Sequence, residues 1–219
     1  MSTIVEPNQV IRGTEDPDIL FGGPGNDTIH GSGGDDVLAG SEGDDVIYGG
    51  EGNDGLGTQG VGSDPGNDRL YGNEGDDLLF GDAGADLLDG GEGNDFLRGG
   101  ADNDNVYGAQ GNDALYGDEG DDYLFGFSGN DQIDGGIGVD HLYGEDGDDI
   151  ILGGPALDTR IDFIDGGVGD DQIYAAAGSD VLFATATPAG FVVRGHLGGT
   201  VPAEHAAIVR RGFIPVVSS

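Results

Sequence analysis

A nine-residue unit recurs eighteen times between Gly13 and Phe183, with the form G-G-x-G-x-D-x-U-x, in which U is a large aliphatic residue. Position six is Asp and position eight is Leu, Ile or Val in every unit, whereas positions seven and nine accept many residue types. Position four is Gly in fifteen units, and position five is Asn or Asp in thirteen. A short period held this strictly requires successive units to fold alike and to stack on one another.

The aliphatic residue at position eight predicts one inward side chain in a strand of about three residues. Glycine at position four and Asn or Asp at position five tolerate a left-handed backbone, so the first six residues of each unit are expected to form a turn. Two units then complete one coil. The sequence therefore predicts an all-β fold, a right-handed parallel β-roll (a β-solenoid) of about nine coils with two nonapeptides per coil and short capping segments at both ends.

Gly-rich, acidic sequence is also typical of disordered, low-complexity chains. The aliphatic residue that follows each Asp by two positions argues against a chain that is disordered under all conditions, because random acidic sequence would not keep that phase.

The units resemble the RTX family, the repeats-in-toxin (hemolysin-type) nonapeptides of secreted bacterial proteins. The segment Gly22-Gly23-Pro24-Gly25-Asn26-Asp27-Thr28-Ile29-His30 shows the pattern. The resemblance implies calcium ions between stacked loops. One loop supplies the carbonyls of positions two and four and its Asp, and the loop one coil away supplies carbonyls one and three and its Asp. Calcium prefers six to eight oxygen ligands, which suits such a set.

Carried onto this sequence, the resemblance assigns metal binding to the Asp at position six of every unit, namely Asp18, Asp27, Asp36, Asp45, Asp54, Asp68, Asp77, Asp86, Asp95, Asp104, Asp113, Asp122, Asp131, Asp140, Asp149, Asp162, Asp171 and Asp180. It also assigns backbone carbonyls of loop residues that include Gly23, Gly25, Gly34, Gly40, Glu42, Gly43, Gly52, Gly66, Gly75, Gly84, Gly93, Gly111, Gly120, Gly129, Gly138, Gly147 and Gly169. Two rows of nine loops would hold up to about sixteen Ca²⁺ ions. Their charge would offset most of the formal net charge of −36.

Several units depart from the pattern. Insertions at 58–62 and 153–156 are expected to bulge outward as loops. Position four is Asp16, Asp102 or Arg160 in three units, which makes a calcium site beside Arg160 doubtful and weakens the sites near Asp102. The first and last units are expected to form incomplete end loops.

The composition divides the chain into an N-terminal cap (1–12), the calcium-binding roll (13–183) and a C-terminal segment (184–219) that contains one acidic residue and three of the seven arginines. We expect short strands at 191–193 and 213–217, and a helix at 202–211. The C-terminal segment is expected to cap the open end of the roll. The resemblance implies that it also acts as a signal for type I secretion.

The chain contains no H-E-x-x-H pair and no G-x-S-x-G serine, so the sequence predicts that it is not an enzyme. Its negative charge disfavours nucleic acid and anionic membrane surfaces as partners. We expect no membrane span, because no apolar segment is long enough. The N-terminus carries no signal peptide pattern. Together with the resemblance, this predicts export through the type I secretion machinery to an extracellular location, with association to a bacterial cell surface as an option.

Alternate units should share a face. The ninth positions of one face then include Tyr48, Tyr71, Tyr107, Phe125, Tyr143 and Phe183, and those of the other face include Phe21, Phe80, Tyr116 and Tyr174. Such ladders usually stabilise a sheet. His30 and His141 also fall at outward positions. The sequence thus predicts a secreted protein that folds on binding extracellular calcium and serves as a structural or cell-surface scaffold. The alternatives are a calcium-dependent module that binds extracellular polysaccharide, or a surface protein that self-associates end to end.

Overall fold

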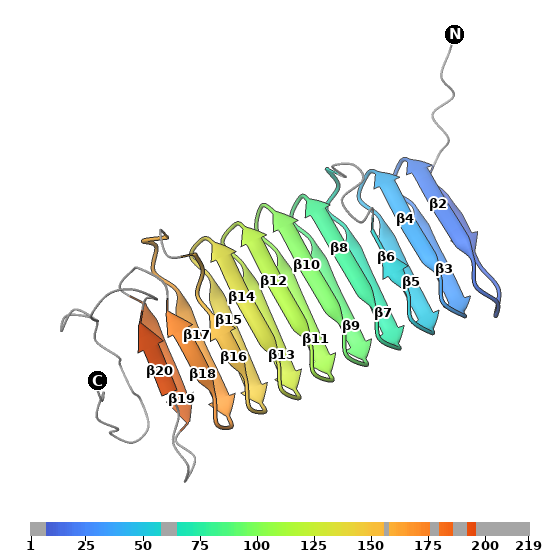
Figure 1. The fold of residues 1–219 in the computed structure, drawn as a ribbon. Helices are drawn as coiled ribbons and strands as arrows, with labels where there is room; N and C mark the ends of the chain where they lie inside the picture. The colour runs from blue at the N-terminus through green and yellow to red at the C-terminus, as the bar shows by residue number, and fades with distance from the viewer. Residues whose placement is uncertain (1–7, 58–64, 156–157, 176–179, 186–191, 196–219) are drawn as a thin grey trace.

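The computed structural model describes residues 8–57, 65–155, 158–175, 180–185 and 192–195, and these form two ten-stranded parallel sheets packed face to face (Figure 1). The odd sheet contains β1 (Val10–Arg12), β3 (Thr28–Gly33), β5 (Val46–Glu51), β7 (Arg69–Glu74), β9 (Leu87–Glu92), β11 (Asn105–Gln110), β13 (Tyr123–Ser128), β15 (His141–Asp146), β17 (Phe163–Val168) and β19 (Val181–Thr185). The even sheet contains β2 (Ile19–Pro24), β4 (Val37–Glu42), β6 (Gly55–Leu56), β8 (Leu78–Ala83), β10 (Phe96–Ala101), β12 (Ala114–Glu119), β14 (Gln132–Ile137), β16 (Ile150–Leu152), β18 (Gln172–Ala175) and β20 (Val192–Gly195).

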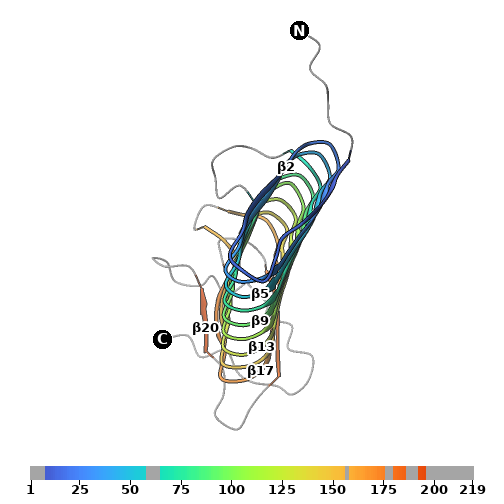
Figure 2. The same cartoon turned by 90° about the vertical axis from the view of Figure 1, so that its right-hand side faces the viewer.

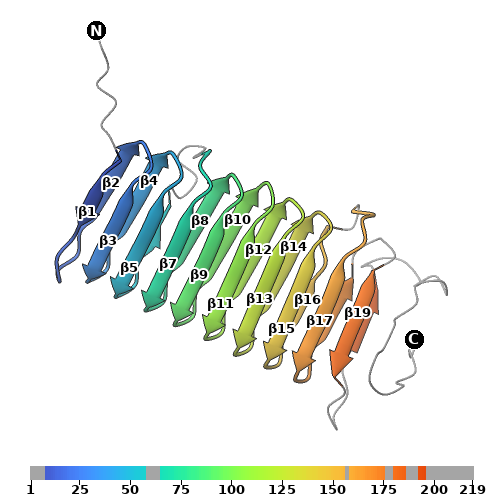
Figure 3. The same cartoon turned by 180° about the vertical axis from the view of Figure 1, so that it is seen from behind.

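The chain alternates between the two sheets, so each strand pairs with the strand two places later in the sequence. Seen from the end, the coils stack as a flattened tube (Figure 2), and Figure 3 shows the roll from the side opposite to Figure 1. This architecture confirms the predicted parallel β-roll of about nine coils.

Most paired residues are 18 positions apart, as two nonapeptides per coil require. Across the two insertions the separation between equivalent Asp residues grows to 23 and 22 residues. The strands nevertheless keep their alternation, because both insertions lie between an even strand and the following odd strand, β6 to β7 and β16 to β17. The residues of the first insertion, and Ala156 in the second, lie outside the described residues.

The core is a double column of the aliphatic residues at position eight. They are at most 1% exposed from the second unit onward: Ile29, Leu38, Ile47, Leu56, Leu70, Leu79, Leu88, Leu97, Val106, Leu115, Leu124, Ile133, Leu142, Ile151, Ile164 and Ile173. Ile11, Leu20 and Leu182 pack against this column at its ends. A column one side chain wide in each sheet explains why position eight accepts only large aliphatic residues.

The strands are longer than the sequence predicted. A regular strand has six residues, because it continues through positions one to three of the next unit, whose backbone groups also pair with the neighbouring coil. The prediction of a six-residue turn and a three-residue strand was therefore wrong. Only positions four to six form the turn.

The left-handed backbone was predicted at positions four and five, but it occurs at positions four and two. Positive φ angles occur at position four, as in Gly43 (φ 129°) and Gly111 (φ 148°), and at position two, as in Ser32 (φ 93°) and Phe127 (φ 72°). No described residue at position five has a positive φ. Its Asn and Asp residues therefore do not serve to permit a left-handed backbone.

One terminal strand of each sheet lies outside the repeat. Val10–Arg12 of the N-terminal segment joins the odd sheet as β1, and Val192–Gly195, near the strand predicted at 191–193, joins the even sheet as β20 beside β18. The predicted helix at 202–211, the predicted strand at 213–217 and residues 1–7 of the predicted N-terminal cap lie outside the described residues. Within the part of the chain that the structure describes, no helix is long and apolar enough to cross a membrane.

Candidate calcium sites between the stacked loops

The position-six Asp residues form two columns along the edges of the roll. In each column the backbone N–H of one Asp donates to Oδ1 of the Asp one coil later, at 2.6 to 3.2 Å. The odd-to-even turns contribute Asp18, Asp36, Asp54, Asp77, Asp95, Asp113, Asp131, Asp149 and Asp171. The even-to-odd turns contribute Asp27, Asp45, Asp68, Asp86, Asp104, Asp122, Asp140, Asp162 and Asp180. Neither insertion breaks a column.

In most of these residues the second carboxylate oxygen is buried without a hydrogen-bond donor. This holds for Oδ2 of Asp27, Asp36, Asp54, Asp77, Asp95, Asp104, Asp113, Asp122, Asp131, Asp140, Asp149, Asp162 and Asp171. A buried carboxylate oxygen is costly unless a positive charge or a donor compensates it. A repeated deficit at one atom type marks the place where a cation belongs.

These oxygens converge on a space kept open by glycine at position one. A Cβ atom added to Gly135 would lie 2.7 Å from Oδ2 of Asp140, and one added to Gly22 would lie 2.7 Å from the carbonyl oxygen of Gly40, one coil later. The space between consecutive coils is thus lined by oxygens. Among the described residues no three His, Asp or Glu side chains gather at one point. A cation here therefore needs main-chain oxygens as further ligands.

Backbone carbonyl groups point into the same gap from both coils. The carbonyls of positions two and four point toward the next coil, as Ser32 does toward Gly50 and Gly93 toward Gly111. The carbonyls of positions one and three point back, as Gly40 does toward Gly22 and as Glu42 does when it accepts the N–H of Gly25 at 2.7 Å. The Asp carboxylates and the backbone carbonyls, around the space that glycine leaves open, form a site lined by oxygen atoms. Such a site suits a hard divalent cation.

The same carbonyl arrangement recurs at the sequence-predicted carbonyl positions. Carbonyl oxygens of position four lie against the next coil at Gly25, Gly34, Gly43, Gly52, Gly66, Gly75, Gly93, Gly111, Gly120, Gly129 and Gly147. Gly23 lies at position two of β2 with φ 97°, and Gly84 at position four with φ 128°. Gly138 and Gly169 face the carbonyls of Gly120 and Gly147.

The electrostatics of the columns reflect this crowding of carboxylates. Burial, followed by the charges of neighbouring Asp residues, raises the pKa of Asp104 and Asp140 to about 8. The same causes raise the pKa to about 7 for Asp77, Asp95, Asp113, Asp149 and Asp162. Backbone N–H donors to these carboxylates lower the pKa but do not cancel the effect of burial. The metal-free columns therefore favour neutral carboxyl groups.

Position five forms a second ladder that the sequence interpretation missed. The N–H of each residue donates to Oδ1 of Asn or Asp one coil earlier, opposite in direction to the position-six ladder, as Asn112 does to Asn94 at 3.0 Å. On the odd-to-even turns the ladder is continuous from Asp35 to Asp170. On the even-to-odd turns Ala85 and Val139 interrupt it. The recurrence of Asn and Asp at position five was the sequence feature that could have indicated this ladder.

The turn with Arg160 departs from the others through Asp158. In regular turns the N–H of position four donates to the position-three carbonyl of the next coil, whereas Gly138 donates to Oδ2 of Asp158 at 3.0 Å. Asp158 is 8% exposed, accepts the N–H of Arg160 at 3.0 Å and lies 3.7 Å from its guanidinium. Asp158 was absent from the predicted site residues. At another turn with a substituted position four, Asp102 adopts the left-handed backbone of the glycine it replaces (φ 78°).

The outward faces carry the aromatic ladders that are predicted when alternate units share a face. On the odd sheet the rings of His30, Tyr48 and Tyr71 stack at 4.9 and 5.0 Å, and those of Tyr107, Phe125 and Tyr143 at 5.5 and 4.6 Å. His141 at position seven stacks between Tyr123 and Phe163. The predicted division of aromatic residues between two faces is confirmed, and both histidines belong to these ladders.

Comparison with known proteins agrees with the loop geometry. A family model for the RTX calcium-binding nonapeptide repeat (four copies) matches residues 8–38, 30–56, 63–97, 89–124, 125–159 and 157–186. A search of curated proteins finds no match. The matched segments span most of the chain and coincide with the stacked coils, so the chain belongs to the RTX calcium-binding nonapeptide repeat family.

Proposed function

We propose that this chain is a secreted, non-catalytic protein that folds on binding extracellular calcium and acts as a structural or cell-surface scaffold. The observation that carries the proposal is the buried Oδ2 atom without a hydrogen-bond partner that recurs along both Asp columns, as in Asp77, Asp104 and Asp140. Calcium would supply the missing positive charge in the gaps between these Asp residues. Proteins with these repeats are typically secreted, and extracellular calcium concentrations suit sites of modest affinity.

The proposed ligands of each ion are the Asp side chains of two successive loops with the carbonyls of positions two and four from the earlier loop and of positions one and three from the later loop. The carbonyl directions at Ser32, Gly40, Glu42 and Gly93 support this set. An interior Asp would then contribute to the ions on both sides of it. Two columns of nine Asp residues leave room for up to about sixteen Ca²⁺ ions.

Calcium titration followed by far-UV circular dichroism tests coupled folding. We expect an unfolded spectrum in calcium-free buffer and a strand spectrum at millimolar calcium, because the unpaired carboxylates oppose the metal-free roll. A strand spectrum that is already complete in excess chelator contradicts the proposal.

Neighbouring residues provide a matched test of the ligands. Asp77→Asn keeps the shape and the hydrogen bond of a column carboxylate but removes its charge, so we expect the calcium midpoint of folding to rise severalfold. Asp76→Asn makes the same charge change at position five, where the side chain is exposed and accepts the N–H of Asn94. We expect only a small shift for this variant. Equal shifts in both variants would show a general charge effect instead of a specific ligand role.

Binding of an extracellular polysaccharide is a second candidate, favoured by the stacked rings of Tyr107, Phe125 and Tyr143 on the odd sheet. Aromatic rings present apolar faces on which sugar rings can pack. Retention of the calcium-loaded chain on alginate and on neutral polymers, lost in Tyr107→Ala and Phe125→Ala variants that still fold with calcium, would establish this role. No retention on any polymer would exclude it for the polymers used.

End-to-end association is supported by apolar residues on the first strands. Val10 of β1 and Ile19 and Phe21 of β2 are 66%, 68% and 63% exposed at the edge where the two sheets begin. Unpaired strand edges with apolar side chains favour self-association. Light scattering across millimolar calcium tests this proposal, and a chain that stays monomeric throughout contradicts it.

A further inference from the structure

One rung is missing from the aromatic ladder of the odd sheet. The residues in register at position nine of β7, β9 and β11 are Tyr71, Asp89 and Tyr107. Tyr71 stacks on Tyr48 and Tyr107 stacks on Phe125, so each ring has one face that no described ring covers, and both of these faces are turned toward the strand of Asp89. The two rings are two strand spacings apart, about 10 Å.

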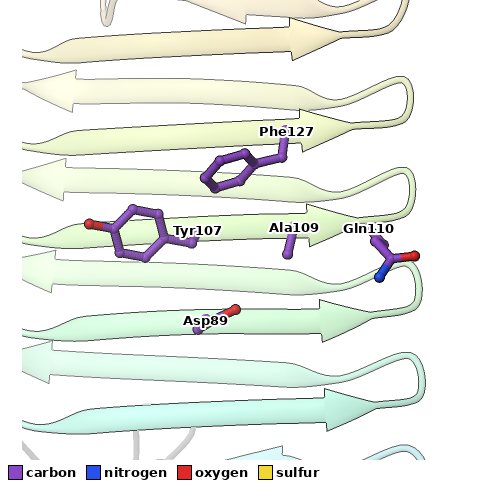
Figure 4. A pocket seen from close by; sticks show the side chains of 5 residues that line it. All are labelled: Asp89, Tyr107, Ala109, Gln110 and Phe127. Atoms are coloured by element: carbon purple, nitrogen blue, oxygen red, sulfur yellow. The ribbon is translucent and has the colours of Figure 1, made fainter.

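The surface is hollowed at this rung. A hollow of about 470 Å³ is lined by Asp89, Tyr107, Ala109, Gln110 and Phe127 (Figure 4). It adjoins a second hollow of about 320 Å³, which extends along Gly91 to Tyr71. The neighbouring column explains the depth, because Gly91 and Ala109 lie in register between Asn73 and Phe127 and supply little side-chain volume. The two hollows together form a slot between the facing sides of the Tyr71 and Tyr107 rings, with room for one flat group between them.

The charge of the slot is negative. The half-buried carboxylate of Asp89 forms its floor, and burial raises the pKa of this group. The exposed side chains of Glu74 and Glu92 lie at its rim. The two ion pairs found among the described residues, Arg98–Asp118 and Arg160–Asp158, involve none of these three carboxylates. The carboxylates of Asp89, Glu74 and Glu92 are also not among the proposed calcium ligands, so metal binding would leave their charges in place.

We propose that this slot binds the guanidinium group of an arginine side chain from a partner protein. A guanidinium is planar, stacks on aromatic faces and pairs with a carboxylate, and the slot offers two such faces with a carboxylate between them. The thickness of one rung admits a single flat group. The three acidic side chains select a cation over a neutral or anionic group.

The even sheet shows that a guanidinium can pair with a carboxylate on the outer face of this roll. Arg98 is in register between Phe80 and Tyr116, at position nine, and its guanidinium pairs with Asp118 of the next coil. The space between those two rings is taken by the ring of Phe96, at 5.8 Å from Phe80 and 5.2 Å from Tyr116. On the odd sheet, position nine holds the carboxylate of Asp89 between Tyr71 and Tyr107, and the arginine of a partner would supply the cation.

Nuclear magnetic resonance titration of the calcium-loaded full chain with N-acetylargininamide tests the slot. We expect saturable shifts of the backbone amides of Asp89, Gly91 and Ala109. Asp89→Asn should weaken binding roughly tenfold, since it removes a charge-assisted hydrogen bond. Tyr107→Ala should weaken binding about threefold through loss of one stacking face. Shifts spread over the acidic turns without saturation would overturn the proposal.

Asp134→Asn is the matched control. Asp134 is also a half-buried carboxylate at position nine, but it lies on the even sheet between Tyr116 and Leu152, and therefore has one aromatic neighbour. We expect this variant to bind N-acetylargininamide as the unaltered chain does. Equal binding of N-acetyllysinamide would reduce the effect to simple charge attraction and overturn the guanidinium assignment. Shifts of the same amides by neutral maltohexaose, unaffected by Asp89→Asn, would assign the slot to a sugar.

Discussion

At the scale of single residues, glycine at position four does two things in this roll. In most units it adopts a positive φ, and it leaves room for a carbonyl oxygen of the preceding coil, which lies where a Cβ atom would otherwise be. At position two, Gly23 (φ 97°) has only the first property, because a Cβ atom added to it would meet no atom of the described residues within 4 Å. Most other position-two glycines, such as Gly50 and Gly91, also face a carbonyl oxygen of the preceding coil. Gly23 and Gly111 therefore differ in their tolerance of alanine.

This difference predicts unequal costs for two Gly→Ala variants. Gly111→Ala would drive its Cβ into the carbonyl oxygen of Gly93, so the backbone must shift, and we expect a loss of roughly 3 to 5 kcal/mol in the calcium-loaded state. Gly23→Ala incurs only the left-handed strain of about 1 kcal/mol. Denaturant unfolding at saturating calcium measures both. Similar losses in the two variants would show that the carbonyl contact is unimportant.

At the scale of turns and strands, each turn is tied to the coils on both sides by two ladders of opposite direction. Position six accepts from the preceding coil, whereas position five accepts from the following coil. Opposed ladders fix the height of each turn relative to its neighbours. That constraint holds the oxygen-lined gaps at one spacing along each edge.

The broken places in the position-five ladder allow a paired test. Ala85→Asn places an acceptor where Asn67 and Asn103 flank it in the same column, so we expect a gain of about 0.5 to 1.5 kcal/mol. Asn112→Ala keeps the backbone N–H bond to Asn94 but removes the bond from Nδ2 to Asn94 and the bond that Oδ1 accepts from the N–H of Asn130, so it should cost at least as much. Unfolding free energies at fixed calcium check both signs. A loss of stability on adding the acceptor at residue 85 would contradict the ladder's role.

The sequence predicted the coil, the inward position eight and the Asp columns, because each follows from one residue type at one phase. It did not predict strand length, the purpose of position five or the role of Asp158. These features depend on pairing between residues 18 to 23 positions apart, which local preference cannot reveal. Asn at position five, for example, tolerates a left-handed backbone, yet the backbone at Asn112 is not left-handed and the side chain bonds to the next coil.

At the scale of the whole molecule, stability depends on two columns of buried carboxylates. Their pKa values rise to between about 6 and 8 at Asp54, Asp77, Asp104 and Asp140 in the metal-free roll, chiefly through burial. An unfolded Asp titrates near about 3.9. A raised folded pKa means that the metal-free roll is most stable below the unfolded pKa and loses stability as pH rises through about 8.

The expected outcome is a calcium-free chain with more strand structure at about pH 5.5 than at about pH 8, because the columns are largely neutral at the lower pH. Far-UV circular dichroism at both values, in buffer freed of calcium, measures the difference. The pH effect should vanish at saturating calcium, where the ions compensate the charge. Greater strand content at the higher pH would mean that the column carboxylates do not limit the metal-free fold.

The even-to-odd turns contain both insertions, the substituted position-four residues Asp102 and Arg160, and the ladder breaks at Ala85 and Val139. The odd-to-even turns from Gly34 to Gly169 keep glycine at position four throughout. Apart from Asp16 in the first unit, these departures thus lie on one long edge of the roll. Segments added along that edge leave the height of every coil unchanged, so it is the side from which this protein can display new sequence, at intervals set by the strand spacing of about 4.8 Å.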